Sequence, residues 1–178
     1  MTKRIKIGGA FALAIFSIWL FFSPYLAAYS MKRAAENRDA DKLSSYVDFP
    51  AVKESFKGQI NAKVASDMAQ ISKDNPFSGL GVALAAAFIS PMVDALVTPE
   101  NLRSMMEGEK PKLGNSQTEP TTAKSGEPNK DIELDMAYKG LNQFSIVVWQ
   151  KDKPEKITFI LNRDGLISWK LVSIRLPL

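Results

Sequence analysis

An uncharged apolar run near the start of the chain constrains its architecture more than any other feature. No charged residue stands between Ile7 and Tyr29, and Lys3, Arg4 and Lys6 precede the run. At about 1.5 Å per residue a helix over this run is roughly 34 Å long, enough to cross a hydrocarbon core of about 30 Å. In lipid the backbone must satisfy its own hydrogen bonds, so a single segment crosses as a helix. The run therefore predicts a transmembrane anchor, with the lipid bilayer as a partner through Ile7 to Tyr29.

A cleaved signal peptide is the competing interpretation, because it also combines a basic start with an apolar core. Its cleavage site would need small residues just before Tyr29, and Leu26 is a poor residue for the position three before the cut. We favour an uncleaved anchor whose short basic tail stays in the cytoplasm, although Lys32, Arg33 and Arg38 follow the run. Under either interpretation, the rest of the chain is exported.

Charge and composition exclude several classes of function. The net charge of +4 comes largely from the three basic residues before the apolar run, so the rest of the 178-residue chain is almost neutral. This balance indicates membrane topology and not a basic surface for nucleic acid, and no nucleic-acid partner is expected. The chain contains no cysteine and no histidine. It therefore lacks thiolate chemistry, the commonest general base and the commonest transition-metal ligand, and we predict no metal site and no cofactor.

Residues 30–107 are predicted to be helical. The clearest pattern places Val52, Phe56, Ile60, Val64 and Met68 at four-residue steps. Pro50 suits the first turn of that helix, which puts the carboxylate of Asp48 near its free backbone N–H groups. Asp39 is predicted to cap a short helix from Ala40 to Tyr46, and Thr98 to cap another from Pro99 to about Glu107.

The stretch from Phe77 to Val97 approaches membrane length and is rich in alanine. A buried core helix, a hairpin lying on the membrane and a true span all fit its composition. Gly79, Gly81, Pro91 and Asp94 weaken the case for insertion, so we favour a core helix.

The end of the chain is predicted to form a sheet. Residues 108–130 are rich in Pro, Gly, Ser and Thr, which predicts a flexible loop. Residues 131–178 then show alternating apolar positions, with Asp164-Gly165 as a hairpin turn. The apolar phase slips between Trp169–Leu171 and Val172–Ile174, which a β-bulge would explain. The prediction is an α+β fold: an N-terminal transmembrane helix in residues 1–29, a helical half, and a C-terminal four-stranded antiparallel β-meander packed on helices in the same domain.

Three motifs in order resemble a bacterial family known as domain of unknown function 2939. They are Tyr46-Val47-Asp48-Phe49-Pro50, Thr98-Pro99-Glu100, and the ending Arg163-Asp164-Gly165-Leu166 with Trp169-Lys170-Leu171. The resemblance covers Pro24 to Pro177 apart from the loop. It implies a membrane segment, a helical half and a C-terminal sheet in a bacterial envelope. With the cytoplasmic start inferred from the basic residues, we expect a single-pass protein of the bacterial inner membrane with its C-terminal domain in the periplasm. The resemblance implies no activity and no catalytic residue.

Five residues are candidates for ligand binding, each beside a structural alternative. Asp48 and Tyr46 form a possible pair, but helix capping next to a packed tyrosine explains their spacing. Arg163 could hold an anion or pair across strands, and Trp169 could line an apolar pocket or pack in the core. Asp94, in its apolar helix, could cap a kink, pair with a base or face a cavity.

Two functions remain open from the sequence. The first is a membrane-anchored binding or interaction domain without catalysis, whose helix–sheet cleft holds an apolar ligand or an envelope protein. The second is a small hydrolase or isomerase with Asp48 or Asp94 as general base in that cleft. No phosphate-binding loop, paired-carboxylate motif or nucleophile elbow is present, which disfavours the second.

Overall fold

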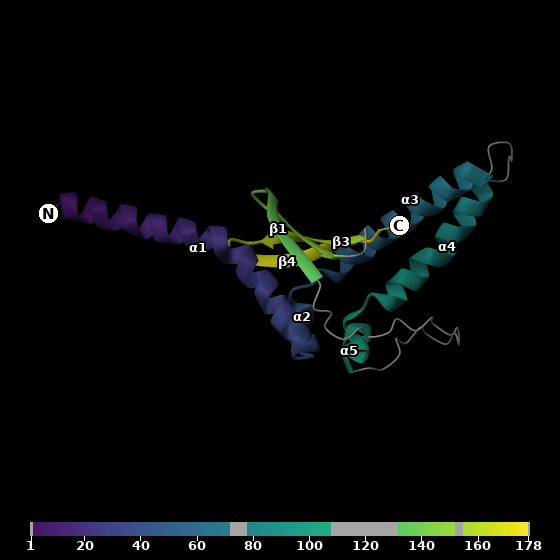
Figure 1. Ribbon diagram of the computed structural model, residues 1–178, viewed down its shortest axis with the longest axis horizontal. Coiled ribbons are helices and arrows are strands. Elements are labelled where there is room, and N and C mark those ends of the chain that lie inside the picture. Colours follow the sequence, from purple (N-terminus) through teal and green to yellow (C-terminus); the bar gives the residue numbers. More distant parts are fainter. Residues whose placement is uncertain (1, 72–77, 108–131, 152–154, 178) are drawn as a thin grey trace.

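The computed structural model describes residues 2–71, 78–107, 132–151 and 155–177. Five helices come first and four strands follow (Figure 1), so the predicted α+β class is confirmed. The helices and strands are α1 (Thr2–Glu36), α2 (Ala40–Ser45), α3 (Phe49–Ile71), α4 (Ser78–Leu96), α5 (Pro99–Glu107), β1 (Ile132–Gly140), β2 (Gln143–Gln150), β3 (Lys156–Asp164) and β4 (Ser168–Arg175). The flexible loop predicted at 108–130 lies outside the described residues.

The sheet is an antiparallel meander in the order β1-β2-β3-β4, as predicted. Ile160 pairs with Ser173 while the next residue, Leu161, pairs with Leu171. Val172 is therefore the extra residue of a β-bulge, which confirms the phase slip seen in the sequence. The predicted turn at Asp164-Gly165 is longer than two residues, because β3 ends at Asp164 and β4 begins only at Ser168.

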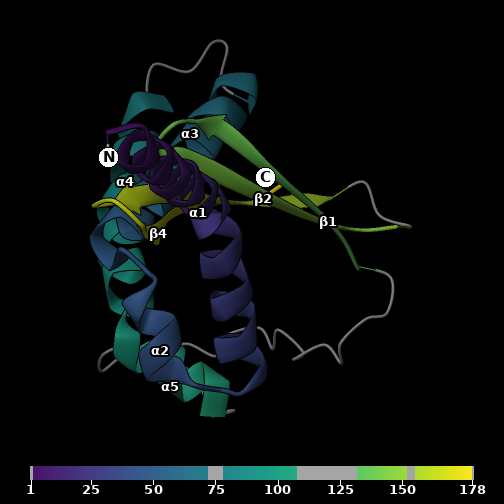
Figure 2. The ribbon, with the colours of Figure 1, turned by 90° about the vertical axis from the view of Figure 1, so that its left-hand side faces the viewer.

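Helix α1 is one continuous helix, and only its second half packs against the domain. Figures 1 and 2 show the first half pointing away from the sheet and the second half running down beside it, with a bend between them. Pro24 lies inside the helix and removes one backbone hydrogen bond, which accounts for a bend there. Four residues of the predicted membrane segment are buried against the domain: Ser23, Pro24, Ala27 and Ala28. The domain therefore takes in residues before Tyr29, where the sequence analysis placed its boundary.

Helices α3 and α4 form a hairpin that extends from the sheet (Figure 1). At Gly81, an added Cβ would lie 3.0 Å from the Cε of Met68, so the glycine permits close packing of the two helices. On its other side α4 exposes Leu84, Phe88 and Met92 at four-residue steps. The prediction of a helix is confirmed, but full burial as a core helix is wrong, because α3 covers only one of its faces.

Among the described residues, no single helix combines the length and the hydropathy that a membrane span requires. The helical segments Ala83–Leu96 and Pro99–Glu107, which meet at an angle of 65°, have that length and hydropathy only when they are taken together.

The segment before α3 joins the helical half to the sheet. Val47 forms a parallel bridge with Leu171: the Asp48 N–H donates to the Leu171 carbonyl at 2.9 Å, and the Leu171 N–H donates to the Tyr46 carbonyl at 2.7 Å. This segment therefore extends the sheet by one bridge beyond β4, and it fixes where α3 begins.

Candidate ligand cavity between the helices and the sheet

A cavity of about 710 Å³ lies between the sheet and the helices. Its volume falls in the range of about 300–1,000 Å³ that is usual for small-molecule sites. Of its 23 lining residues, all but four carry aliphatic, methionine or phenylalanine side chains; the four are Tyr25, Tyr29, Lys32 and Thr98. Such a lining favours an apolar ligand.

One wall of the cavity is formed by the residues on the face of the sheet that is turned toward the helices. Leu134 pairs with Val148 and Met136 with Ile146, so alternate residues of β1 and β2 point into the cavity. Phe159 continues the row on β3, opposite Ile146. The alternation visible in the sequence had indicated that these strands have one apolar face. It carried no signal that the helices leave a gap over that face.

The helical walls come from α1, α2, α3, the end of α4 and α5. On α1, Tyr25, Tyr29 and Lys32 follow one another at steps of four and three residues, so they share one face of the helix. The hydroxyl of Thr98 is engaged as the N-cap of α5, where it accepts the Asn101 N–H at 3.1 Å. Thr98 therefore adds little polarity to its wall, and the other polar side chains of the lining, Tyr25, Tyr29 and Lys32, line up along α1.

The lining residues at the floor of the cavity are buried, and those at its mouth are exposed to solvent. The floor residues are buried, with exposed fractions of 5% for Ala28, 2% for Val52, 9% for Ile146 and 5% for Leu171. The mouth lies where exposed residues of three elements meet. On α1, Tyr29 is 64% exposed and the side chain of Lys32 is 63% exposed. Met105 on α5 is 57% exposed, and Leu134 on β1 is 48% exposed. As far as the described lining goes, the cavity is therefore apolar at depth, and its one charged side chain lies at the opening.

Aromatic rings pack beside the cavity where α1 enters the domain. The rings of Tyr25 and Phe144 lie 4.8 Å apart, and those of Tyr138 and Phe144 lie 5.2 Å apart, all edge to face. The Tyr138 hydroxyl donates to the Phe21 carbonyl at 2.7 Å, and burial raises the pKa of this phenol. These contacts hold β1 against α1 from Phe21 onward.

Two of the predicted ligand-binding residues lie beside the cavity without lining it. The Asp48 carboxylate accepts the Ala51 N–H at 3.1 Å, so it caps α3 as the structural alternative proposed. Tyr46 contributes to a smaller pocket of about 380 Å³, together with Trp169 and Lys170. The neighbour between them, Val47, is the residue of this motif that reaches the large cavity.

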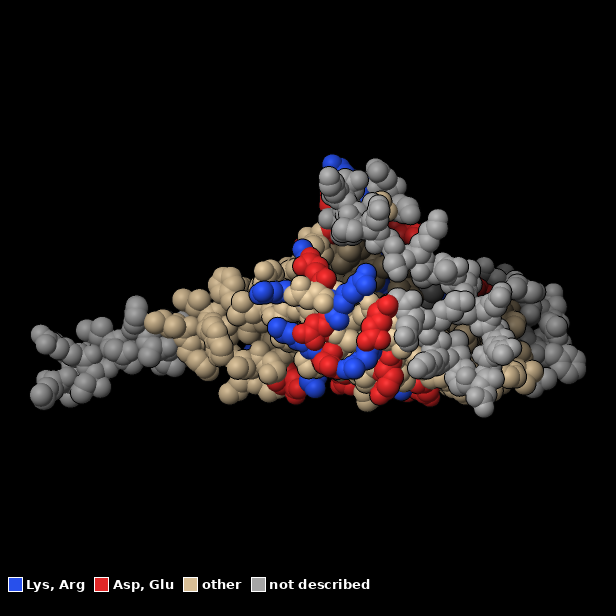
Figure 3. Space-filling model, turned by 90° about the horizontal axis from the view of Figure 1, so that it is seen from below, with Lys and Arg blue, Asp and Glu red and all other residues tan. Residues whose placement is uncertain are grey.

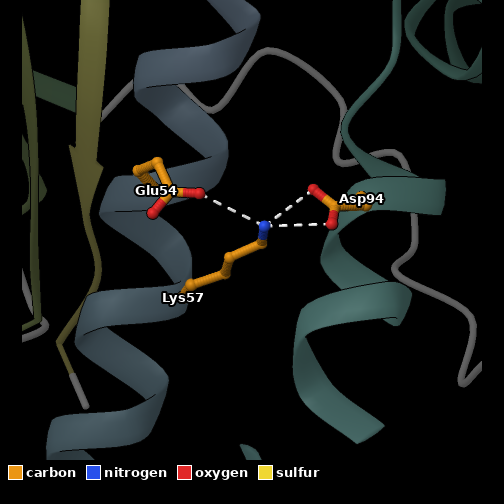
Figure 4. Close-up of polar contacts among 3 residues, drawn as sticks. All are labelled: Glu54, Lys57 and Asp94. Atoms are coloured by element: carbon orange, nitrogen blue, oxygen red, sulfur yellow. Dashed lines mark hydrogen bonds and ion pairs between the residues drawn. The ribbon is translucent and has the colours of Figure 1, made fainter. Parts of the chain in front are cut away.

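Asp94 pairs with a lysine on the neighbouring helix. Its carboxylate lies 2.9 Å from Nζ of Lys57, which also contacts Glu54 at 3.2 Å (Figure 4). The hydrogen bond with Asp94 raises the pKa of Lys57. Of the three roles considered for Asp94, pairing with a base is the one observed, and its contact joins α3 to α4 outside the cavity.

Arg163 and Trp169 contact each other at the far end of the sheet. The guanidinium lies 4.5 Å from the centroid of the indole ring and donates to the carbonyls of Leu141 and Leu166. Trp169 is 1% exposed, and its indole N–H donates to the Ser23 hydroxyl at 2.8 Å. Packing of β3, β4 and α1 against one another therefore accounts for both residues, and none of the five predicted residues lines the large cavity.

Charges of both signs surround the helical end of the domain. Figure 3 shows lysine, arginine, aspartate and glutamate interleaved on the underside, beside an uncharged stretch of α1. The ion pairs Lys32–Glu36 and Arg103–Asp41 belong to the elements found there. Among the described residues no group of three or more histidine, cysteine or acidic side chains could hold a metal ion.

The chain was compared with protein families, with curated proteins and with solved structures, and the comparison with families gave a match. No curated protein and no solved structure matches the chain. The model of the family described as "Protein of unknown function (DUF2939)" matches residues 13–105, from the first half of α1 to α5. The motifs at Arg163 and Trp169 lie outside this match, so the resemblance noted for the sheet is not part of it. The match spans more than half of the sequence, and the chain belongs to this family of unknown function.

Proposed function

We propose that this protein is a membrane-tethered binding domain that takes an apolar ligand into its helix–sheet cavity. The observation that carries the proposal is the lining of the cavity, where apolar side chains from the sheet and from five helices surround about 710 Å³. Apolar side chains on opposite sides of a cavity of this size are too far apart to make dispersion contacts with one another. A ligand that fills the space would add the missing dispersion contacts.

The tether is proposed from the first half of α1. Ile15, Phe16, Ile18 and Trp19 are all exposed, and so are Phe21 and Phe22. An exposed apolar run of this kind is unfavourable in water and favourable in lipid. The uncharged residues ahead of the domain, 7–22, form about 24 Å of helix, less than a hydrocarbon core of about 30 Å. The domain would therefore rest against the bilayer surface, and the bilayer would thin locally.

Orientation follows from the basic residues before the run. Lys3, Arg4 and Lys6 favour a cytoplasmic start, which places the domain in the periplasm of a bacterium with a single crossing of the inner membrane. Cleavage before Tyr29 would remove Ala27 and Ala28 from the core, which favours an uncleaved anchor. Because the chain has no cysteine, Lys42→Cys supplies a single thiol on the domain. Labelling of this thiol by a membrane-impermeant maleimide in intact spheroplasts is expected; protection until lysis would contradict the orientation.

Ligand binding is tested by filling the cavity. Val148 lines the cavity, whereas the adjacent Val147 points to the opposite face of the sheet, so Val148→Trp and Val147→Trp form a matched pair. The full chain is transferred from detergent into amphipol and titrated with the neutral fluorophore N-phenylnaphthylamine. We expect Val148→Trp to weaken binding by about tenfold or more, since it occupies the ligand's space, and Val147→Trp to leave it unchanged. Equal binding by both folded variants would refute the proposal, and Ala28→Phe tests the opposite wall.

The enzymatic alternative loses its proposed site. Asp48 and Asp94 are the two carboxylates it named; one caps α3 and the other pairs with Lys57, and neither lines the cavity. A general base must reach its substrate within hydrogen-bonding distance. The geometry therefore supports binding in the cavity better than catalysis by either residue.

A further inference from the structure

We infer that the ligand of the cavity is a single-chain amphipath with an anionic head, such as a long-chain fatty acid. The inference rests on the proposed function and adds the chemistry of the ligand. Three features of the cavity support this ligand: its apolar floor, the composition of its mouth, and the row of polar groups on α1.

The floor admits only hydrocarbon. Ala28, Val52, Ile146 and Leu171 are buried there and carry no polar side-chain atom. Within the described residues, no buried side-chain nitrogen or oxygen lacks a hydrogen-bond partner, so none awaits a polar ligand atom at depth. A polar group carried to the floor would lose its hydration without compensation, at a large cost in affinity.

The mouth selects a negative head group. Lys32 is the only charged residue among the described residues that line the cavity, and Tyr29 stands one turn before it on the same face of α1. A head group at this opening meets one ammonium and one phenol, while Met105 and Leu134 flank the first part of the chain. Charge complementarity therefore favours an anion, with its hydrocarbon directed toward the sheet.

A competing carboxylate is close but weakly held. Glu36 lies 3.7 Å from Nζ of Lys32, and both side chains are more than 60% exposed. Exposed pairs of this kind contribute little, so a bound anion can take the place of Glu36 or share the ammonium with it. The same exposure limits what Lys32 contributes to a ligand, to about two- to fivefold in affinity.

The ligand class is tested by inverting the charge at the mouth. Lys32→Glu is compared with Arg33→Glu, which makes the same charge change at the next residue of α1, a residue that does not line the cavity. The probes are palmitate, the matching alcohol and the matching alkylammonium, each competing with N-phenylnaphthylamine on the full chain in amphipol. We expect Lys32→Glu to weaken palmitate binding by about tenfold and to strengthen alkylammonium binding. The alcohol should be unaffected, and Arg33→Glu should behave as the parent protein.

Chain length gives a second readout. Each added methylene is expected to tighten binding roughly fourfold until the chain fills the floor, after which the gain stops. Equal affinity for all three head groups in both variants, with the neutral probe still bound, would overturn the anionic ligand and leave the proposed function intact. Failure of every probe to bind would refute the proposed function itself. A third result would overturn the single-chain inference: vesicles of diacyl phosphatidylglycerol displace N-phenylnaphthylamine from the cavity, and palmitate does not. The cavity would then be assigned to an acyl chain of a bilayer lipid.

Discussion

The indole N–H of Trp169 donates a hydrogen bond of 2.8 Å to the hydroxyl of Ser23, and thereby joins the last strand to the N-terminal helix. Both residues are buried, with exposed fractions of 1% and 6%. Ser23 lies in the run that the sequence assigns to the membrane, yet it is a core residue of the domain.

Ser23→Ala is expected to lower the free energy of unfolding by about 1–3 kcal/mol, because it leaves the buried indole N–H without an acceptor. Urea unfolding of the full chain in detergent micelles measures this loss. In the background of Trp169→Phe the same substitution should cost much less, since the donor is already gone. Strict additivity of the two substitutions would contradict the role of this hydrogen bond.

Two truncations test where the domain begins. A chain that starts at Phe21 keeps the residues of α1 that are described as buried and should fold with a cooperative thermal transition. A chain that starts at Ser30 lacks Ala27, Ala28 and the hydroxyl of Ser23, and should lose that transition. Near-ultraviolet circular dichroism reports the packing of Trp169 in each. A cooperative transition in the shorter chain would place the boundary at Tyr29 after all.

Gly165 is the one described glycine with a positive φ, at +78°. Gly165→Ala is expected to lower the free energy of unfolding by about 1–2 kcal/mol, since a Cβ is strained in that conformation. Gly165→Asn should cost less, because asparagine tolerates it better. Gly140→Ala in the preceding hairpin is the matched control and should be nearly neutral, as nothing lies within 4 Å of the added atom. Thermal unfolding ranks the three variants.

The contact between Lys57 and Asp94 is expected to hold α4 on α3. Asp94→Asn should speed amide hydrogen exchange along α4 while the strands keep their protection, because the contact joins only the two helices. The exchanged pair, Lys57→Asp with Asp94→Lys, should recover part of the protection. Glu54→Gln is the control, since its carboxylate is highly exposed and lies on the same helix as Lys57. If the amides of α4 exchange at the same rate in the parent protein and in all variants, apolar packing alone holds the hairpin of α3 and α4.

Alkaline pH should weaken the contact of β1 with α1. Burial raises the pKa of Tyr138 in the folded protein above its ordinary value of 10.0, so the folded state holds the phenolic proton more tightly than the unfolded chain does. This contribution to stability is fully present below pH 10.0 and is lost as the pH rises through the folded pKa. Tyrosinate absorbance and unfolding free energy, followed together, should show the loss in the parent protein. Tyr138→Phe should lose less stability over the same range, with Tyr29→Phe as an exposed control.

The meander and its bulge could be predicted because they depend on local patterns. Alternating side chains mark the strands, and the slip at Val172 leaves a trace in the sequence itself. The caps at Asp39, Asp48 and Thr98 were predicted for the same reason, since each bonds an N–H three residues away. Such contacts involve neighbours in the sequence.

The end of the apolar run and the cavity could not be predicted in this way. Lipid and a protein core select the same side chains, so Ala27 and Ala28 suit either environment. The cavity depends on how far α1 and α3 stand from the sheet, which is a property of packing and not of periodicity. The candidate residues were four side chains with polar groups and one tryptophan, whereas the cavity is lined largely by apolar residues that the sequence places in the membrane segment or on the apolar faces of helices and strands.

The continuity of α1 has a mechanical consequence. Helix α1 runs without a coil segment from the largely exposed residues Ile15 to Phe22 to the packed residues Tyr25 and Tyr29, so the bend at Pro24 is the one interruption between them. Under the proposed function, a change in tilt of the first part of α1 would displace one wall of the cavity, and this would link the occupancy of the cavity to the inclination of the helix.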